Sequence, residues 1–555
     1  MRPGVGQARP LATSMQVQPG SNEPAIEEGR KQMRKTLFGM DLAANRREFL
    51  KGTVGAGILL VGLSAARAQT EQGGTPVTGG HLKLGLDGGS TTDTLDPAGY
   101  ISAFAFVLAR SFGDHLVESD PVTGKPVPSI AESWESSDNA KTWTFKIRND
   151  VEFHNGKKLT VDDVVKTLQR HSDEKSRSGA LGFLKAIASI EGHGNELVVK
   201  LSESNVDLPL IFTAYHLVIQ PNGGYDNPSE GIGTGPYKLV NFEPGVRALF
   251  EKNKNDWRER GHVDSFEIIV MNDATARTAA ITAGKVHFVN SIGAKTVPLL
   301  KRVAGLQILD TPSRGHFTMP MQVDKAPFDN ADLRLALKYA VDREAILKTA
   351  LGGYGTIGND FPINATYPYF PADIEQRAYD PDKAAFHFKK SGHDGPVVLR
   401  TADGIFSGAV DTALLFQESA KKAGIKVDVK REPADGYWTN VWRATPFCLS
   451  YYGSRLTQDL MYATEHLSDS PANETNFNRP DFDKIIKEAR SEADDAKRAE
   501  LYHAAAVMVR DEGGSIIPVF NNYLNAAGKR LKGYIHDVGN DMSNGYIASR
   551  VWLEA

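Results

Sequence analysis

The sequence has little cysteine and no excess of one charge. Cys448 is the single cysteine among 555 residues. It cannot form a disulfide within the chain, and its isolation excludes zinc and redox sites built from cysteine pairs. The chain carries 64 lysines and arginines against 68 aspartates and glutamates, a net charge of −4. A nucleic-acid-binding protein would show a basic stripe, so the composition argues against that class of partner.

Motifs of several enzyme classes are also missing. The sequence has no Gly-x-Ser-x-Gly nucleophile elbow, no His-Glu-x-x-His zinc motif and no Gly-Lys-Ser/Thr phosphate loop. The 14 histidines are scattered, without a pair at zinc-ligand spacing. The loop Gly231-x-Gly233-x-Gly235-Pro236 lacks the phosphate-loop ending and does not open a helix. We therefore expect no enzyme activity, no cofactor and no metal.

No apolar run approaches the roughly 20 residues that a transmembrane helix needs. The short run from Val54 to Leu63 follows the pair Arg46-Arg47 and precedes Ala66-Arg67-Ala68. This order predicts a twin-arginine export signal over residues 45–68, with cleavage before Gln69 and a soluble periplasmic product. The alternative is a buried helix beside two unrelated arginines. Residues 1–44 should be a disordered leader that is not retained, with translation starting at Met40.

Apolar periodicity alternates between strand-like and helix-like along the rest of the chain. Strands are predicted at 81–86, 143–147, 196–201, 425–429 and 515–520. Helices are predicted from Thr160 as N-cap, and over 274–283, 332–351, 384–391, 410–423, 482–492 and 497–511. The alternation predicts an α/β protein with more than one lobe.

Several short sequence motifs, which follow one another in a fixed order, carry a resemblance to a known family. They are Leu95-Asp96-Pro97, Ala131-Glu132-Ser133-Trp134, the segment 143–164 that contains Phe153-His154-Asn155-Gly156, Gly233-Thr234-Gly235-Pro236-Tyr237, Pro327-Phe328, Arg334-x-Ala336-Leu337-x-Tyr339-Ala340-Val341-Asp342-Arg343, Tyr379-Asp380-Pro381 and Ile517-Pro518. Together they resemble the oligopeptide-, dipeptide- and nickel-binding proteins of ABC importers, solute-binding family 5. The segment 143–164 is the most specific of them.

The resemblance implies a three-lobed periplasmic binding protein, type II and cluster C-like. Lobe I would be discontinuous, over 78–118, 232–310 and 516–555; lobe II would be an insertion over 119–231; lobe III would span 311–515 and close over the ligand by a hinge. A monomer would capture a peptide or peptide-like solute between lobes I and III and deliver it to the membrane subunits of an ABC permease. Most matched residues should have structural roles, with Asp342 and Arg343 ending a helix as a local ion pair.

The resemblance also points to a ligand loop. Peptide-binding members carry a loop of the form Trp-x-x-Asp, whose aspartate takes the α-ammonium of the peptide. The matching segment here is 449–459, and aligning Tyr452 with the tryptophan puts Arg455 at the aspartate position. A guanidinium prefers a carboxylate or phosphate, so an acidic solute is one option. Asp459 is a second candidate for the acceptor role, and an Arg455–Asp459 pair at helical spacing, without a ligand, is the alternative.

Further candidate ligand residues surround that loop or follow the first strand. They are Trp438, Tyr451, Tyr452, Gly453, Ser90, Thr91 and Thr92. Amphipathic aromatic residues often line small-molecule clefts, although Trp438 could instead pack under the loop. The family resemblance leaves nickel or haem binding open, but no residue pattern in this sequence supports either. An exported hydrolase and a peptide-holding chaperone are the alternatives from other functional classes.

Overall fold

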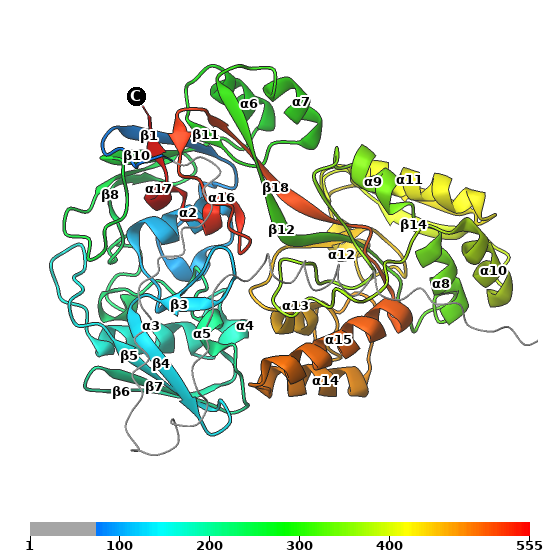
Figure 1. The fold of residues 1–555 in the computed structure, drawn as a ribbon, viewed down its shortest axis with the longest axis horizontal. Coiled ribbons are helices and arrows are strands. Elements are labelled where there is room, and N and C mark those ends of the chain that lie inside the picture. Colours follow the sequence, from blue (N-terminus) through cyan, green and yellow to red (C-terminus); the bar gives the residue numbers. More distant parts are fainter. Residues whose placement is uncertain (1–73, 555) are drawn as a thin grey trace, which may run out of the picture. The chain divides into compact units, whose positions relative to one another are not determined.

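The largest sheet of the computed structural model has ten strands and joins segments from both ends of the described chain, residues 74–554 (Figure 1). Its order is β16-β12-β18-β11-β1-β10-β9-β8, with β13 on β18 and β17 on β12. The strands are β1 (His81–Leu86), β8 (Tyr237–Glu243), β9 (Arg247–Lys252), β10 (Ser265–Val270), β11 (Phe288–Val289), β12 (Leu306–Pro320), β13 (Gly355–Ile357), β16 (Ser450–Tyr452), β17 (Ser515–Ile516) and β18 (Val519–Gly528). Strand β1 pairs in parallel with β10 and β11, whereas the other pairs are antiparallel.

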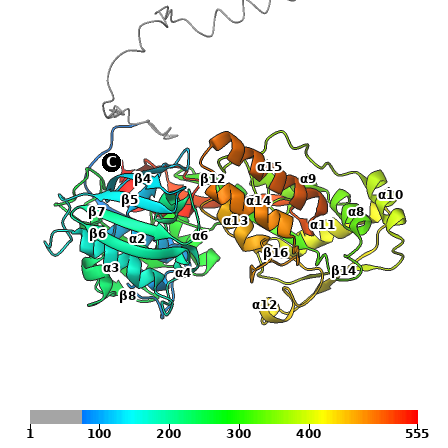
Figure 2. The same ribbon diagram turned by 90° about the horizontal axis from the view of Figure 1, so that it is seen from below.

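The long strands β12 and β18 connect two regions of the molecule. We call residues 74–310 and 524–554 the first region and residues 317–519 the second, because separate hydrophobic clusters fill them. The pairing runs from Leu306 opposite Gly528 to His316 opposite Phe520, with a register shift between Pro312 and His316. Figure 2 shows the two regions from below. The register shift therefore lies at the passage from one region to the other.

The first region carries a second antiparallel sheet, in the order β4-β5-β7-β6. The strands of this sheet are β4 (Ala131–Ser137), β5 (Thr142–Ile147), β6 (Ile187–His193) and β7 (Glu196–Leu201). The first region also contains β2 (Val117–Ser119), β3 (Pro126–Pro128), β19 (Leu531–Lys532) and β20 (Trp552–Leu553). Its helices are η1 (Pro97–Gly99), α2 (Ala103–Phe112), α3 (Val161–Ser172), α4 (Leu181–Leu184), α5 (Leu208–Ile211), η2 (Pro221–Gly224), α6 (Ala274–Thr282), η3 (Ala294–Thr296), α7 (Val297–Leu300), α16 (Asp541–Asn544) and α17 (Ile547–Arg550).

Local signals explain the start of α3 and the packing of β5. Thr160 caps α3 in a capping box with Asp163, whose carboxylate accepts from the Thr160 amide at 3.0 Å. Trp143, Phe145 and Ile147 alternate along β5 and are buried in one cluster. The predicted N-cap at Thr160 and the predicted strand at 143–147 are confirmed, and the three apolar residues have a structural role, as expected of most matched residues.

The second region holds most of the remaining helices. They are α8 (Ala331–Tyr339), α9 (Arg343–Thr349), α10 (Pro381–Ser391), α11 (Ala409–Lys422), α12 (Tyr437–Asn440), α13 (Gln458–Glu465), α14 (Pro480–Ser491) and α15 (Asp495–Glu512). The parallel pair β14 (Val397–Thr401) and β15 (Val427–Arg431) completes it. The predicted strands at 425–429 and 515–520 differ in detail: the first starts two residues later, and the second divides into β17 and the start of β18.

The single helix predicted over 332–351 was wrong, because α8 and α9 are separate. Asp342 does not end a helix: it is the N-cap of α9 and accepts from the Ala345 amide at 2.9 Å. Arg343 pairs not with Asp342 but with Asp360, through its Nη2 at 2.6 Å. The apolar spacing continues across the break because both helices bury residues in the same cluster.

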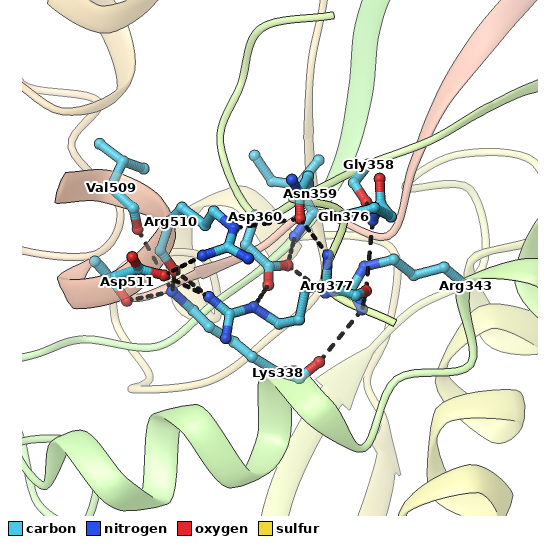
Figure 3. A network of polar contacts seen from close by, with 12 residues as sticks. Lys338, Arg343, Gly358, Asn359, Asp360, Gln376, Arg377, Val509, Arg510 and Asp511 are labelled. Atoms are coloured by element: carbon cyan, nitrogen blue, oxygen red, sulfur yellow. Dashed lines mark hydrogen bonds and ion pairs between the residues drawn. The ribbon is translucent and has the colours of Figure 1, made fainter. Parts of the chain in front are cut away.

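Asp360 joins a buried network of basic groups around α8 and α15 (Figure 3). Arg343 and Arg377 contact its two carboxylate oxygens at 2.6 and 3.0 Å. Lys338 donates to the carbonyl oxygens of Arg510 and Gly513 at 2.7 and 2.8 Å. The motif residues 334–343 thus hold the second region together, in agreement with the predicted structural role.

The predicted leader and export signal lie outside the residues that the structure describes. The boundaries predicted for the three lobes remain a prediction. Within residues 74–554, no helix is long and apolar enough to cross a membrane. The predicted mixture of helices and strands is confirmed by the elements given above.

Candidate functional site

A cavity of about 400 Å³ lies where β16 meets α12 and α13. It is lined by Trp438, Trp442, Ser450, Tyr451, Tyr452, Gly453, Arg455, Thr464 and Ala472. Strand β16 pairs with β12, which places Tyr451 opposite Phe317 and Tyr452 opposite His316. Five of the predicted ligand residues, Trp438, Tyr451, Tyr452, Gly453 and Arg455, therefore meet at one cavity.

Aromatic rings form one wall of this cavity. Trp438 is 44% exposed, and its ring lies edge-on to Tyr451, with 5.6 Å between centroids, and to Trp442, with 6.0 Å. Its neighbour Tyr437 is buried and donates its hydroxyl to the Leu449 carbonyl at 2.8 Å. Tyr437, rather than Trp438, thus packs under the loop, and Trp438 presents a flat apolar surface with an N–H donor.

Arg455 reaches the cavity with contacts to neutral groups. Its Nη1 donates to the carbonyl oxygens of Gly453 and Ser454 at 3.2 and 3.3 Å, and its Nε to Thr464 Oγ1 at 3.4 Å. No carboxylate within residues 74–554 lies within 4.0 Å of its guanidinium. These contacts are long and weak, so the cation keeps donors for an anion.

Asp459 lies apart from Arg455, so the alternative of an Arg455–Asp459 pair was wrong. Arg455 precedes the N-cap Thr457 of α13, whereas Asp459 is inside the helix, so helical spacing does not relate them. Asp459 is 2% exposed, and both its oxygens accept from Arg490 Nε at 3.0 Å. Burial, together with the nearby Asp207, raises the pKa of Asp459 despite Arg490. It lines a different cavity, of about 390 Å³.

Arg314 supports the backbone of the loop, and sequence reasoning missed it. Its Nη1 donates to the carbonyl oxygens of Arg455 and Leu456 at 3.3 and 2.8 Å, and its guanidinium carbon lies 4.3 Å from the Tyr367 ring centroid. The side chain is buried, and burial lowers its pKa. No motif marks Arg314 in the sequence, because its partners are backbone carbonyl groups at Thr366, Arg455 and Leu456, all far from it along the chain.

A buried acid behind the aromatic wall was also missed. Trp442 Nε1 donates to Glu474 Oε2 at 2.6 Å, and Glu474 is 1% exposed. Burial, reinforced by the charge of Glu465, raises the pKa of Glu474 to about 8. Glu465 in turn lies 3.2 Å from His316 Nε2, and both side chains are fully buried. Burial opposes ionisation of Glu465, but His316, His466 and Arg455 outweigh it and lower its pKa. At neutral pH a protonated Glu474 thus contacts Trp442 without adding a second negative charge to that of Glu465.

Ser90, Thr91 and Thr92 do not line this cavity. They form a turn after β1, where Ser90 Oγ and Thr92 Oγ1 lie 3.0 Å apart, and Ser90 donates its amide to Asp93 Oδ2 at 2.7 Å. The side chains of Ser90 and Thr92 thus take part in closing this turn of the first region.

Residues 74–554 contain no cluster of three or more histidine, cysteine, aspartate or glutamate side chains placed to hold a metal ion. The cavity at Arg455 instead offers aromatic faces, a hydroxyl at Thr464 and one guanidinium. This set suits an organic solute with an anionic group.

Comparisons with known proteins identify chains that this one resembles. The family described as "Bacterial extracellular solute-binding proteins, family 5 Middle" matches residues 125–474. Heme-binding protein A of Haemophilus influenzae is 25% identical over 460 residues, covering 76% of this chain and 84% of that protein. The dipeptide-binding protein of Escherichia coli is 22% identical over 468 residues, covering 76% and 86%.

A solved structure has the same fold. The periplasmic binding protein AgaA from A. tumefacien R10, in complex with agropinic acid, aligns with a TM-score of 0.70 at 23% identity. The alignment covers 86% of this chain and 99% of that one. The predicted periplasmic-binding-protein fold is therefore confirmed.

Proposed function

The chain belongs to the bacterial extracellular solute-binding proteins, family 5, and on this premise we propose that it captures a peptide-like solute with an acidic group. It is the substrate-binding component of an ABC importer, and the membrane permease is its partner. The solute class is the specific part of the proposal. Relatives named for dipeptide or heme binding, and a structural neighbour that holds agropinic acid, make a small organic solute reasonable.

Arg455 carries this proposal. It is a guanidinium at an aromatic-walled cavity, and its hydrogen bonds are to neutral groups and at least 3.2 Å long. A cation without a direct carboxylate contact among residues 74–554, beside aromatic walls, favours a carboxylate over an ammonium group. The same position holds an aspartate in the peptide-binding pattern, so this chain should not hold a simple peptide by its ammonium.

Several finer features belong to the same proposal. The protein is exported by the signal at residues 45–68, works in the periplasm as a monomer, and consists of three lobes with the boundaries predicted from the sequence. It binds without chemical conversion, since its family consists of solute-binding proteins. Solute binding shifts an open–closed equilibrium toward the closed form.

Native mass spectrometry of the protein purified from its own periplasm tests the proposal. We expect a co-purified solute that carries at least one carboxylate and is recovered chemically unchanged after incubation. A chemically altered product would instead favour an exported hydrolase. Weak binding of many unrelated peptides would favour a peptide-holding chaperone.

A further inference from the structure

A short segment of the first region contacts two helices of the second region. The Val206 amide donates to the Arg490 carbonyl at 3.0 Å, which links the segment before α5 to α14. Leu456 and Leu460 of the second region pack against the hydrophobic cluster around β5 and β7. These contacts join residues that lie more than 240 positions apart, and they lie away from the strands β12 and β18 that connect the regions covalently.

Asp207 and Arg498 form a buried ion pair at this contact. Arg498 Nη2 lies 2.5 Å from Asp207 Oδ2, and the two side chains are only 7% and 8% exposed. Arg498 Nε also donates to the Ala489 carbonyl at 3.0 Å, so the guanidinium is fixed within the second region. Burial opposes the charge of Arg498, but Asp207 outweighs it, and the pKa of the guanidinium is raised.

The position of Asp207 in its own region is unusual. It is the N-cap residue of α5, where an aspartate normally accepts from the first amides of the helix, yet its side chain makes no such bond. Its backbone amide is held by Asn205 Oδ1 at 2.9 Å. The local structure therefore directs the carboxylate outward to Arg498, at the expense of a helix cap.

Two ion pairs lie at the contact, one inside the second region and one between the regions. The second region contributes Arg490, Arg498 and Asp459, and Arg490 and Asp459 neutralise one another through two 3.0 Å contacts. Arg498 has its carboxylate partner in the first region. Asp207 thus supplies the direct carboxylate contact of Arg498, and Asp459 adds a weaker attraction from within the second region.

We propose that Asp207 and Arg498 form a latch that holds the two regions in the closed arrangement. The latch regulates the site of the proposed function. It rests on that function only because closure of the two regions serves solute capture. In an open arrangement both groups are hydrated, so each carries its charge without a penalty. On closing, each compensates the other, whereas one alone would be buried without a partner.

The cost of burying an unpaired charge predicts opposite outcomes for single and double replacements. Asp207→Asn leaves Arg498 uncompensated on closing, and Arg498→Met does the same to Asp207. Each should lower the closed-to-open ratio by roughly a hundredfold or more. Asp207→Asn combined with Arg498→Met buries no net charge and should recover most of the ratio, because replacing both partners of a buried pair is often nearly neutral.

Hydrogen exchange at the Val206 amide measures the closed fraction directly, since that amide is bonded across the contact. The measurement uses the full mature protein without added solute, and electron-transfer fragmentation resolves the residue. Amides of β5 and β7 serve as an internal reference for the integrity of the first region, and those of α14 and α15 for the second. Lys295→Met is the matched control, because Lys295 pairs across the regions with Asp411 at 2.9 Å but is 78% exposed.

We expect Val206 to be protected in the wild type and in Lys295→Met, to lose protection roughly a hundredfold in each single variant, and to regain most of it in the double variant. Equal protection in wild type and single variants would overturn the latch. So would an unprotected Val206 in the wild type, or loss that spreads equally to the reference amides. None of these results depends on a solute, so a failed search for an acidic solute would refute the proposed function and leave the latch standing.

Discussion

Both carboxylate oxygens of Asp459 accept from Arg490 Nε at 3.0 Å. The pair binds the first turn of α13 to α14 inside the second region. Because Asp459 is engaged there, Arg455 is left with carbonyl and hydroxyl partners at its cavity. The first prediction follows from this separation.

Arg455→Ala should weaken binding of the acidic solute by roughly ten- to a hundredfold, since a hydrogen bond to a charged group contributes about 1.5–3 kcal/mol. Arg455→Lys should recover only part of the affinity, because lysine keeps the charge but loses the planar fork. Calorimetric titration with the solute identified by native mass spectrometry measures both. Arg431→Ala is the control, as Arg431 is an exposed arginine paired with Asp403. Unchanged affinity in Arg455→Ala would refute the anionic solute.

Trp438 should report on the solute through its fluorescence. Its ring is 44% exposed and lies beside Tyr451 at the cavity, so a bound solute should cover it and shift its emission to shorter wavelength. Trp438→Ala should reduce this shift, leaving only the part that comes from Trp442, and weaken binding. Trp552 is buried in the first region, and Trp552→Phe should leave the shift in place. A shift and an affinity that are both unchanged in Trp438→Ala would contradict this contact.

Glu474 should make stability depend on pH. Its folded pKa of about 8 exceeds the ordinary 4.5, so the folded protein keeps a proton that the unfolded chain releases between these values. Its contribution to stability is therefore fully present below pH 4.5 and is lost as pH rises through 8. Relative to Glu474→Gln, the wild type should lose up to about 1.4 kcal/mol per pH unit in this window. Urea unfolding of the wild type and of Glu474→Gln from pH 5 to 8 measures this loss. If the free energy of unfolding varied with pH in the same way in both proteins, the prediction would be contradicted.

Asp360→Asn should destabilise the protein by about 3–5 kcal/mol, because Arg343 and Arg377 would stay buried without a carboxylate. Burial raises the pKa of Asp360, but the two arginines outweigh it and lower the pKa below its usual value. Its contribution is thus present above about pH 4 and lost as pH falls through the folded pKa. Chemical denaturation measures this. The exposed Asp403→Asn should change stability by about 0–1 kcal/mol, and a similar small effect at Asp360 would contradict the prediction.

Export should depend on the arginine pair. Arg46→Lys with Arg47→Lys should stop export, whereas deletion of residues 1–39 should leave it intact, because the signal lies within residues 45–68. Immunoblots of periplasmic fractions and N-terminal sequencing of the mature protein, expected to start at or near Gln69, check both. Loss of export on deleting only residues 1–39 would show that the leader is needed.

Elements with local signals could be predicted closely. Strands β1 and β7 have the predicted bounds because alternation over six residues defines both ends. Helix α3 starts where Thr160 and Asp163 form the capping box. The break between α8 and α9 was not predicted, since the apolar spacing continues through it and only the cap at Asp342 marks it. The candidate site was predicted in part: its aromatic residues and Arg455 lie close together in the sequence.

The sequence by itself determined the α/β class, the family and the cluster of aromatic residues around Arg455, because these depend on periodicity and on neighbours along the chain. Tertiary structure decided the partners of the charges. Asp459 pairs with Arg490, Arg343 with Asp360, and Asp207 with Arg498 across 291 positions. A buried charge must find a partner wherever the fold brings one, and spacing in the sequence does not reveal which one that is.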